Sequence, residues 1–175
     1  MSLLYSDEFK GETTIENDYE FAYLFSNCSN VLNAKNLSLP ATTLATYCYA
    51  SMFRNCTNLI TTPELPATIL DEACYDNMFN GCTSLITAPE LSAEALAENC
   101  YRYMFKNCTS LIVAPELPAT TLTYACYAFM FQGCTNLTTA PELSATTTAE
   151  SCYNGMFYNC TNLTTAPALP ATTLI

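Results

Sequence analysis

The chain has 175 residues, half of them hydrophobic, which is enough for one ordinary domain with a buried core. Its formal net charge of −11, from 16 acidic against 5 basic residues, excludes DNA, RNA and anionic membranes as electrostatic partners. The absence of histidine excludes Ser-His-Asp and Cys-His catalysis and every histidine-containing zinc set.

The first 20 residues differ from the rest of the chain. Six of them are acidic, and we expect them to form an N-terminal cap on the remaining residues. They have neither the basic nor the apolar region of a signal peptide. No apolar run anywhere approaches the ~20 residues of a membrane span, so we expect no membrane insertion.

From residue 21 onward the sequence repeats one frame. Segments such as MFRNCTNL (52–59), MFKNCTSL (104–111) and MFYNCTNL (156–163) recur every 26 residues, and LFSNCSNV (24–31) is a degenerate earlier copy. Two cysteine series share this spacing: Cys48, Cys74, Cys100, Cys126 and Cys152, and Cys56, Cys82, Cys108, Cys134 and Cys160. The repetition indicates a scaffold of about six units.

Each unit begins with a short extended segment. In the unit that starts at Cys108, Pro115 and Leu117 alternate with Glu116, which predicts a strand with the first two side chains on one face and the glutamate on the other. The sequence PATTL then predicts a turn, because proline fixes φ and threonine hydroxyls cap the start of the next segment.

The second half of the unit has helical spacing. Cys126, Met130 and Cys134 lie at i, i+4 and i+8, which predicts one buried stripe of a short helix. Gly133, replaced by Asn in other copies, suits a left-handed exit from that helix.

Stacking is required because no single unit can bury its apolar face alone. Strands stack at ~4.8 Å whereas packed helices need ~8–10 Å, so the helices are expected on the convex side and a parallel sheet on the concave side. We expect an α/β solenoid, a right-handed leucine-rich-repeat-like superhelix of about six 26-residue repeats over residues 21–175. It is expected to be a fragment of a longer protein.

The recurring frame MFxxCxxL…PxLP resembles bacterial surface leucine-rich repeats of the BspA type. The resemblance covers about residues 21–175, although the 26-residue unit is longer than the common form and a proline lies in the strand. Members of that family are mostly exported or surface-attached proteins of host-associated microbes that are implicated in adhesion. The resemblance therefore implies an extracellular or cell-surface location and a binding role.

The eleven cysteines have three possible interpretations. They are buried free thiols, disulfides or thiolate metal ligands, and the spacing favours the first. Cysteines eight residues apart on a helix are ~12 Å apart, beyond the ~7 Å limit for a disulfide, and no C-x-x-C pair occurs. We expect no metal and no cofactor.

Two further columns of repeated residues are candidate binding surfaces. The tyrosines form either a packing ladder or an aromatic strip for a protein or glycan: Tyr49, Tyr75, Tyr101, Tyr127 and Tyr153. The glutamates point out of the expected sheet, one per strand, and serve either solubility or recognition of a basic partner or a hard cation: Glu64, Glu90, Glu116 and Glu142.

No residue is a catalytic candidate. Glycoside hydrolysis requires one carboxyl group with a raised pKa and one with a normal pKa, which four equivalent glutamates do not provide. The expected function is a non-enzymatic interaction or adhesion module that binds a protein or glycan ligand at a cell surface through the concave sheet and its flanking loops. The alternative is a purely structural spacer in a larger surface or fibre protein.

The C-terminal edge is a further candidate for contact. Residues 169–175 show no polar cap, and an open parallel edge leaves backbone N–H and C=O groups unpaired. We therefore expect self-association there, with two such edges meeting in an isologous dimer.

Overall fold

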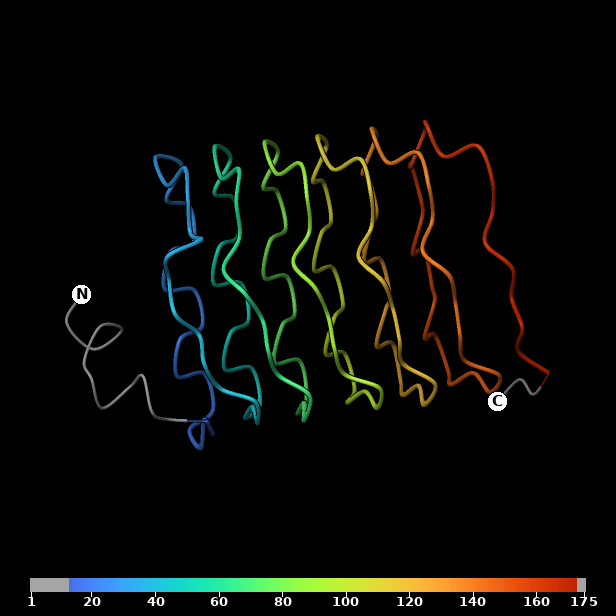
Figure 1. Ribbon diagram of the computed structural model, residues 1–175, viewed down its shortest axis with the longest axis horizontal. Coiled ribbons are helices and arrows are strands. Elements are labelled where there is room, and N and C mark those ends of the chain that lie inside the picture. The colour runs from blue at the N-terminus through green and yellow to red at the C-terminus, as the bar shows by residue number, and fades with distance from the viewer. Residues whose placement is uncertain (1–12, 173–175) are drawn as a thin grey trace.

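The computed structural model describes residues 13–172, which form coils that lie side by side in chain order (Figure 1). Six ten-residue runs of turns lie on one side of the stack, at residues 18–27, 46–55, 72–81, 98–107, 124–133 and 150–159. We call these runs together the turn ribbon. Most of the expected cap at residues 1–20, and the last three residues of the expected C-terminal edge, lie outside the described residues.

The regular elements expected from the sequence are replaced by turns and single bridges. Residues 13–172 contain no α-helix and no strand longer than an isolated parallel bridge. The helix expected around Cys126, Met130 and Cys134 is instead the turn run 124–133. Its buried stripe is real, since all three side chains are fully buried, but the backbone that carries it is not helical.

Two kinds of hydrogen bond alternate along each row of the turn ribbon. In the row 46–55, the N–H of Ala50 donates to the carbonyl of Tyr47 three residues earlier, at 3.0 Å, and closes a turn. The neighbouring N–H of Tyr49 donates to the carbonyl of Cys74 in the next coil, also at 3.0 Å. Every second amide therefore folds the row, and the amides between them join it to the next.

A left-handed backbone recurs every four residues along each row. In the row 46–55 the residues with positive φ are Tyr47 at 54°, Ser51 at 56° and Asn55 at 58°. Each is the third residue of a turn, where type II turns require positive φ. Because this backbone repeats every fourth residue, it brings i, i+4 and i+8 side chains to one face, as an α-helix also does.

The expected left-handed position at Gly133 is confirmed. Its φ is 74°, and the equivalent Gly81, Asn55 and Asn107 also have positive φ. An added Cβ at Gly133 would collide with Oδ1 of Asn107, which leans over it from the preceding coil. At Gly81 and Gly133 the asparagine of the preceding coil therefore occupies the space that a side chain would need. Asn55 instead follows Asn27 and donates its Nδ2 to Oδ1 of Asn27 at 3.0 Å.

The opposite side of each coil is extended. Parallel bridges join Thr87 to Val113 and Ala95 to Thr121, at the two ends of the segment that contains Pro89–Leu91. Within this segment Pro89 and Leu91 are buried and Glu90 is exposed. The inward and outward alternation expected for the extended segment is therefore correct, although few backbone bonds join these segments.

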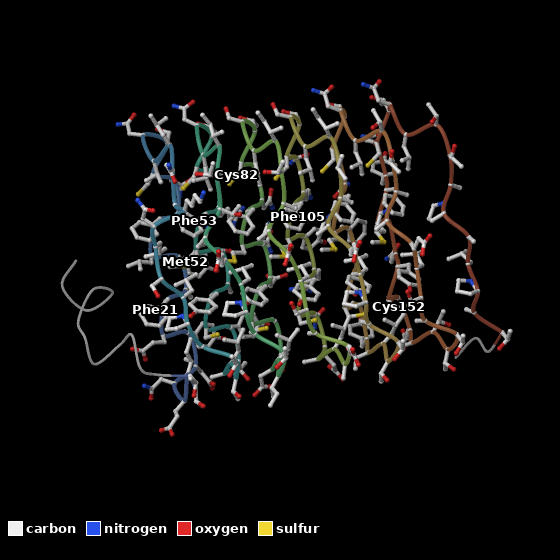
Figure 2. All side chains as sticks on the ribbon, viewed as in Figure 1. Phe21, Met52, Phe53, Cys82, Phe105 and Cys152 are labelled. Carbon is white, nitrogen blue, oxygen red and sulfur yellow. The ribbon has the colours of Figure 1, made fainter. Side chains whose placement is uncertain are left out.

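The core lies between the two sides and consists of columns of like residues. The phenylalanine column stacks Phe53 on Phe79 and Phe79 on Phe105, with ring centroids 5.6 and 5.7 Å apart. Figure 2 labels Phe53 and Phe105, which lie two coils apart along this column. Methionine, cysteine and leucine columns fill the remaining space and are fully buried in the internal coils.

The spacing of the turn ribbon removes the reason for a convex helical side. That expectation assumed helices ~8–10 Å apart on one side and strands on the other. Rows of the ribbon are joined directly by backbone hydrogen bonds of 2.7–3.0 Å, as strands are. The spacing between rows of the ribbon is therefore set by backbone hydrogen bonds and not by the packing of helices.

Candidate functional site

The glutamate column occupies the exposed side of the extended segments. We call this surface, made by Pro63–Leu65, Pro89–Leu91, Pro115–Leu117 and Pro141–Leu143, the proline face. All four glutamates on it are exposed, and each is held between a buried proline and a buried leucine: Glu64, Glu90, Glu116 and Glu142. The buried neighbours fix the direction of each carboxylate, so the acids point outward in one row.

Between neighbouring segments of the proline face lie three successive grooves. The first has a volume of about 600 Å³ and lies between Glu64 and Glu90. The second, of about 480 Å³, lies between Glu90 and Glu116, and the third, of about 240 Å³, lies between Glu116 and Glu142. Each groove is therefore lined by two carboxylates, and the middle two glutamates each line two grooves.

The prolines explain why the grooves exist. Proline has no N–H to donate, so it interrupts any hydrogen-bonded ladder between adjacent extended segments. Within the described residues no backbone hydrogen bond crosses between coils at 62–67, 88–93, 114–119 or 140–145. The coils are joined on either side of this stretch and are not joined by backbone hydrogen bonds along it.

The chemistry of the grooves is acidic with an apolar floor. Leu65, Leu91 and Pro115 contribute buried apolar surface, and Glu64 and Glu90 contribute charge. Lys35 lines the first groove and is the one basic residue among the described residues that line any of the three. This arrangement suits a partner that offers positive charge together with apolar contacts.

The tyrosine column is not a surface strip, which corrects one of the two candidate sites. Tyr49, Tyr75 and Tyr101 are each 1% exposed, and Tyr127 is 2% exposed. Their rings stack between coils at centroid distances of 5.8–5.9 Å, and Tyr153 in the last row continues the stack half-buried. In the turn ribbon the residue after each first cysteine points inward, so no ligand reaches the four rings in the internal rows.

Burial also perturbs the titration of the tyrosine column. Burial of the ring raises the pKa of Tyr153 to about 12 and raises the pKa of Tyr75 well above its ordinary value. The hydroxyl of Tyr49 is buried and has no hydrogen-bond partner among the described residues. The column therefore contributes packing, and its hydroxyls are not poised for acid–base chemistry.

The cysteines are structural in their placement. All eleven are free thiols, of which Cys28 alone is exposed. Burial raises the pKa of Cys126 to about 11 and the pKa of Cys48 to about 12, so these thiols stay protonated at neutral pH. Within the described part of the chain, no three Cys, Asp or Glu side chains lie close enough together to hold a metal ion.

A small cation–aromatic cluster on the outer face of the turn ribbon was not anticipated from the sequence. The ring of Tyr103 stacks on Phe129 at 5.1 Å, and Nζ of Lys106 lies 4.8 Å from the centroid of the Tyr103 ring. Arg102 Nε donates to Oδ1 of the buried Asp76 at 2.9 Å. The residue types at these positions vary from one repeat to the next. That variation is the sequence signal from which the cluster could have been found.

Comparison of the chain with family models, with curated proteins and with solved structures finds no match. Among residues 13–172, no helix has the length and apolar character that crossing a bilayer requires. The grooves of the proline face and the resemblance of the repeat frame are therefore the features of this chain that bear on its function.

Proposed function

We propose that this chain is a non-enzymatic interaction or adhesion module of a bacterial surface or secreted protein, and that it binds its ligand at the proline face. The observation that carries the proposal is the row of three grooves, each between two outward glutamates. The ligand is a protein or glycan at a cell surface, and the fold is a right-handed superhelix of the BspA leucine-rich-repeat class.

Repetition of the grooves favours an extended ligand that crosses several coils. A side chain or group that fits one groove finds an equivalent groove one coil further along, so several weak contacts add within one complex. The carboxylates select positively charged groups and increase the rate of encounter, because the whole chain carries a net charge of −11. A lysine- or arginine-rich extended segment of a host protein is the occupant that this chemistry suits best.

Equivalence of the four glutamates argues against catalysis. Acid–base chemistry needs two groups in different environments, whereas each glutamate here is exposed and lies between a buried proline and a buried leucine. Binding benefits from equivalence, since each repeat adds a similar contact. The proposal therefore assigns the column to recognition.

The test compares two variants of equal charge. We expect Glu90→Gln/Glu116→Gln to weaken binding to immobilised extracellular-matrix proteins, host receptors or glycans, because it removes both carboxylates of the middle groove. The control, Glu72→Gln/Glu98→Gln, removes two exposed acids on the turn ribbon and should leave binding unchanged. Equal losses in both variants would reduce the effect to net charge and refute a role for the proline face.

The alternative is a structural spacer, and the continuous turn ribbon favours it. Five backbone hydrogen bonds join each row to the next without a break from residues 18–27 to residues 150–159. Such a ribbon would set the distance between its two ends, whatever ligand its faces bind. A chain that binds none of the proteins or glycans in the binding screen, at physiological salt, would support the spacer over the adhesion module.

A further inference from the structure

The turn ribbon has a direction. At each of its five interfaces, five N–H groups of one row donate to five carbonyl groups of the next row toward the C-terminus, and none of these bonds runs the other way. The first interface shows the pattern, with Tyr19 donating to Thr46 and Phe25 donating to Met52. One side of every row therefore offers only donors, and the other side offers only acceptors.

In the two outermost rows these groups have no partner among the described residues. In the last row the alternate N–H groups donate no hydrogen bond to the described residues: Ser151, Tyr153, Gly155, Phe157 and Asn159. In the first row the alternate carbonyl groups accept none from the described residues: Asp18, Glu20, Ala22, Leu24 and Ser26. Within residues 13–172, one end of the ribbon is therefore a row of five donors, and the other is a row of five acceptors.

We propose that this chain associates head to tail with further copies of itself, the last row of one turn ribbon docking on the first row of the next. In the register of the internal interfaces, Ser151 N–H would meet the carbonyl of Asp18, and Asn159 N–H would meet that of Ser26. Five hydrogen bonds form, as at every internal interface. Association of this heterologous kind is open-ended and builds filaments.

Donor direction also decides against the isologous dimer that the sequence suggested. Two C-terminal edges of the turn ribbon would bring N–H groups to face N–H groups, with no acceptor between them. Buried amides without partners are costly, and few are found in native structures. The C-terminal edge is therefore complementary to the N-terminal edge of a copy and not to itself.

Side-chain columns continue across the proposed junction. Phe157 in the last row is half-buried, and the column would continue when Phe25 of the next copy stacks on it, as Phe25 stacks on Phe53 at 5.3 Å within the chain. Cys160 donates its thiol to the carbonyl of Phe131 in the preceding coil at 3.0 Å. The exposed Cys28 of the next copy has the equivalent position toward the carbonyl of Phe157.

One position at the junction is claimed by both copies. Thr172 donates its N–H to the carbonyl of Thr146, and Thr42 donates its N–H to the carbonyl of Thr13, so Thr13, Thr42, Thr146 and Thr172 hold equivalent positions in their coils. Thr13 of the incoming copy and Thr172 of the receiving copy therefore fall at one position. Thr172 holds its place by one backbone bond among the described residues, against five bonds gained along the ribbon. Displacing Thr172 therefore costs fewer hydrogen bonds than docking along the ribbon gains.

Blocking each end separately tests the proposal. A bulky maleimide-polyethylene-glycol reagent at Cys28 blocks the acceptor row without a substitution, because the other ten cysteines are buried. Phe157→Lys blocks the donor row, and Tyr158→Lys, at a side chain that is 61% exposed, is its control with the same charge change. Sedimentation velocity over a range of concentrations measures the result, with melting temperature as the check on folding.

We expect the unblocked chain and Tyr158→Lys to grow beyond the dimer as concentration rises, and to grow more at high salt, which screens the repulsion between acidic copies. Each blocked form alone should stay monomeric, and the two mixed should stop at a dimer. A Cys28-blocked chain that still dimerises would establish the isologous edge instead. An unblocked chain that remains monomeric at millimolar concentration and high salt would overturn the proposal.

Discussion

The thiol of Cys108 donates a hydrogen bond to the backbone carbonyl of Phe79 in the preceding coil, with Sγ and O 3.1 Å apart. The same bond recurs from Cys82 to Phe53 and from Cys134 to Phe105. Each of these carbonyls also accepts a hydrogen bond from the N–H of the cysteine three residues later, which closes a turn. The repeated cysteine is thus a small apolar side chain that fills the core and satisfies one further lone pair with a weak donor.

Replacing one of these thiols should destabilise the stack. Cys108→Ala removes a fully buried sulfur together with its hydrogen bond, and we expect a loss of about 1–3 kcal/mol in the free energy of unfolding. Urea unfolding measures it. Cys28→Ala, at the exposed position, is the control and should change the free energy of unfolding by less than about 0.5 kcal/mol. Equal effects at the two sites would refute the structural role.

Stability should fall steeply in alkali. Burial raises the pKa of Cys126 to about 11 and that of Cys48 to about 12, whereas in the unfolded chain a thiol ionises near about 8.5. Above that pH the unfolded state releases protons that the native state keeps, so the free energy of unfolding decreases as pH rises. The stabilisation is complete below about pH 8.5 and is lost progressively toward pH 11–12, by up to about 1.4 kcal/mol per pH unit for each thiol.

Melting temperatures at pH 7, 9, 10 and 11 measure this loss. Titration with a thiol reagent at pH 7 should modify one cysteine in the native chain and eleven in the denatured chain. A melting temperature that stays constant to pH 11 would show that the thiols ionise in the native state and are not buried.

The glutamates of the proline face should not contribute to stability. Glu90 and Glu116 are exposed, and among the described residues neither has an ion pair, so Glu90→Gln/Glu116→Gln removes only a like-charge repulsion. We expect an unchanged or slightly higher melting temperature by calorimetry. A fall of many degrees would mean that the two carboxylates are paired or buried.

Position 155 should tolerate only glycine because the ring of Phe129 lies against it. Its φ is 59°, and an added Cβ would overlap Cδ1 and Cε1 of the Phe129 ring. Gly155→Ala should therefore cost about 1–3 kcal/mol, part from the left-handed backbone and part from displacement of the ring. Combining it with Phe129→Ala should recover the second part, and strict additivity in this double-mutant cycle would contradict the contact.

The sequence predicted the repeat, the buried columns and the outward glutamates because these follow from period and hydrophobicity. It predicted helices wrongly because Cys126, Met130 and Cys134 have a spacing that α-helices and a ribbon of type II-like turns share. Ala125 and Phe129 adopt positive φ, which their residue types disfavour, and in this conformation their N–H groups donate to Glu150 and Asn154 in the next row. That constraint is tertiary, so no local pattern contained it.

The tyrosine column was misplaced for the same reason. On a helix Tyr127 would lie at the edge of the buried stripe, whereas in the turn ribbon it points into the core beside Cys126. The groove-forming role of Pro89 and Pro115 was not recognised either. A proline in a strand predicts missing hydrogen bonds, but the volume that results depends on how far the adjacent coils are held apart.

Amide hydrogen exchange tests the central claim, a directional turn ribbon, most directly. In the dilute protein, amides of the internal row 98–107 should be protected at both kinds of position, the turn-closing and the row-joining. In the last row, protection should alternate: Cys152, Asn154 and Met156 protected, and Tyr153, Gly155 and Phe157 exchanging freely. At concentrations where copies associate, these free amides should become protected. Uniform protection of consecutive amides from 151 to 159 in the dilute monomer would indicate a helix and contradict the account.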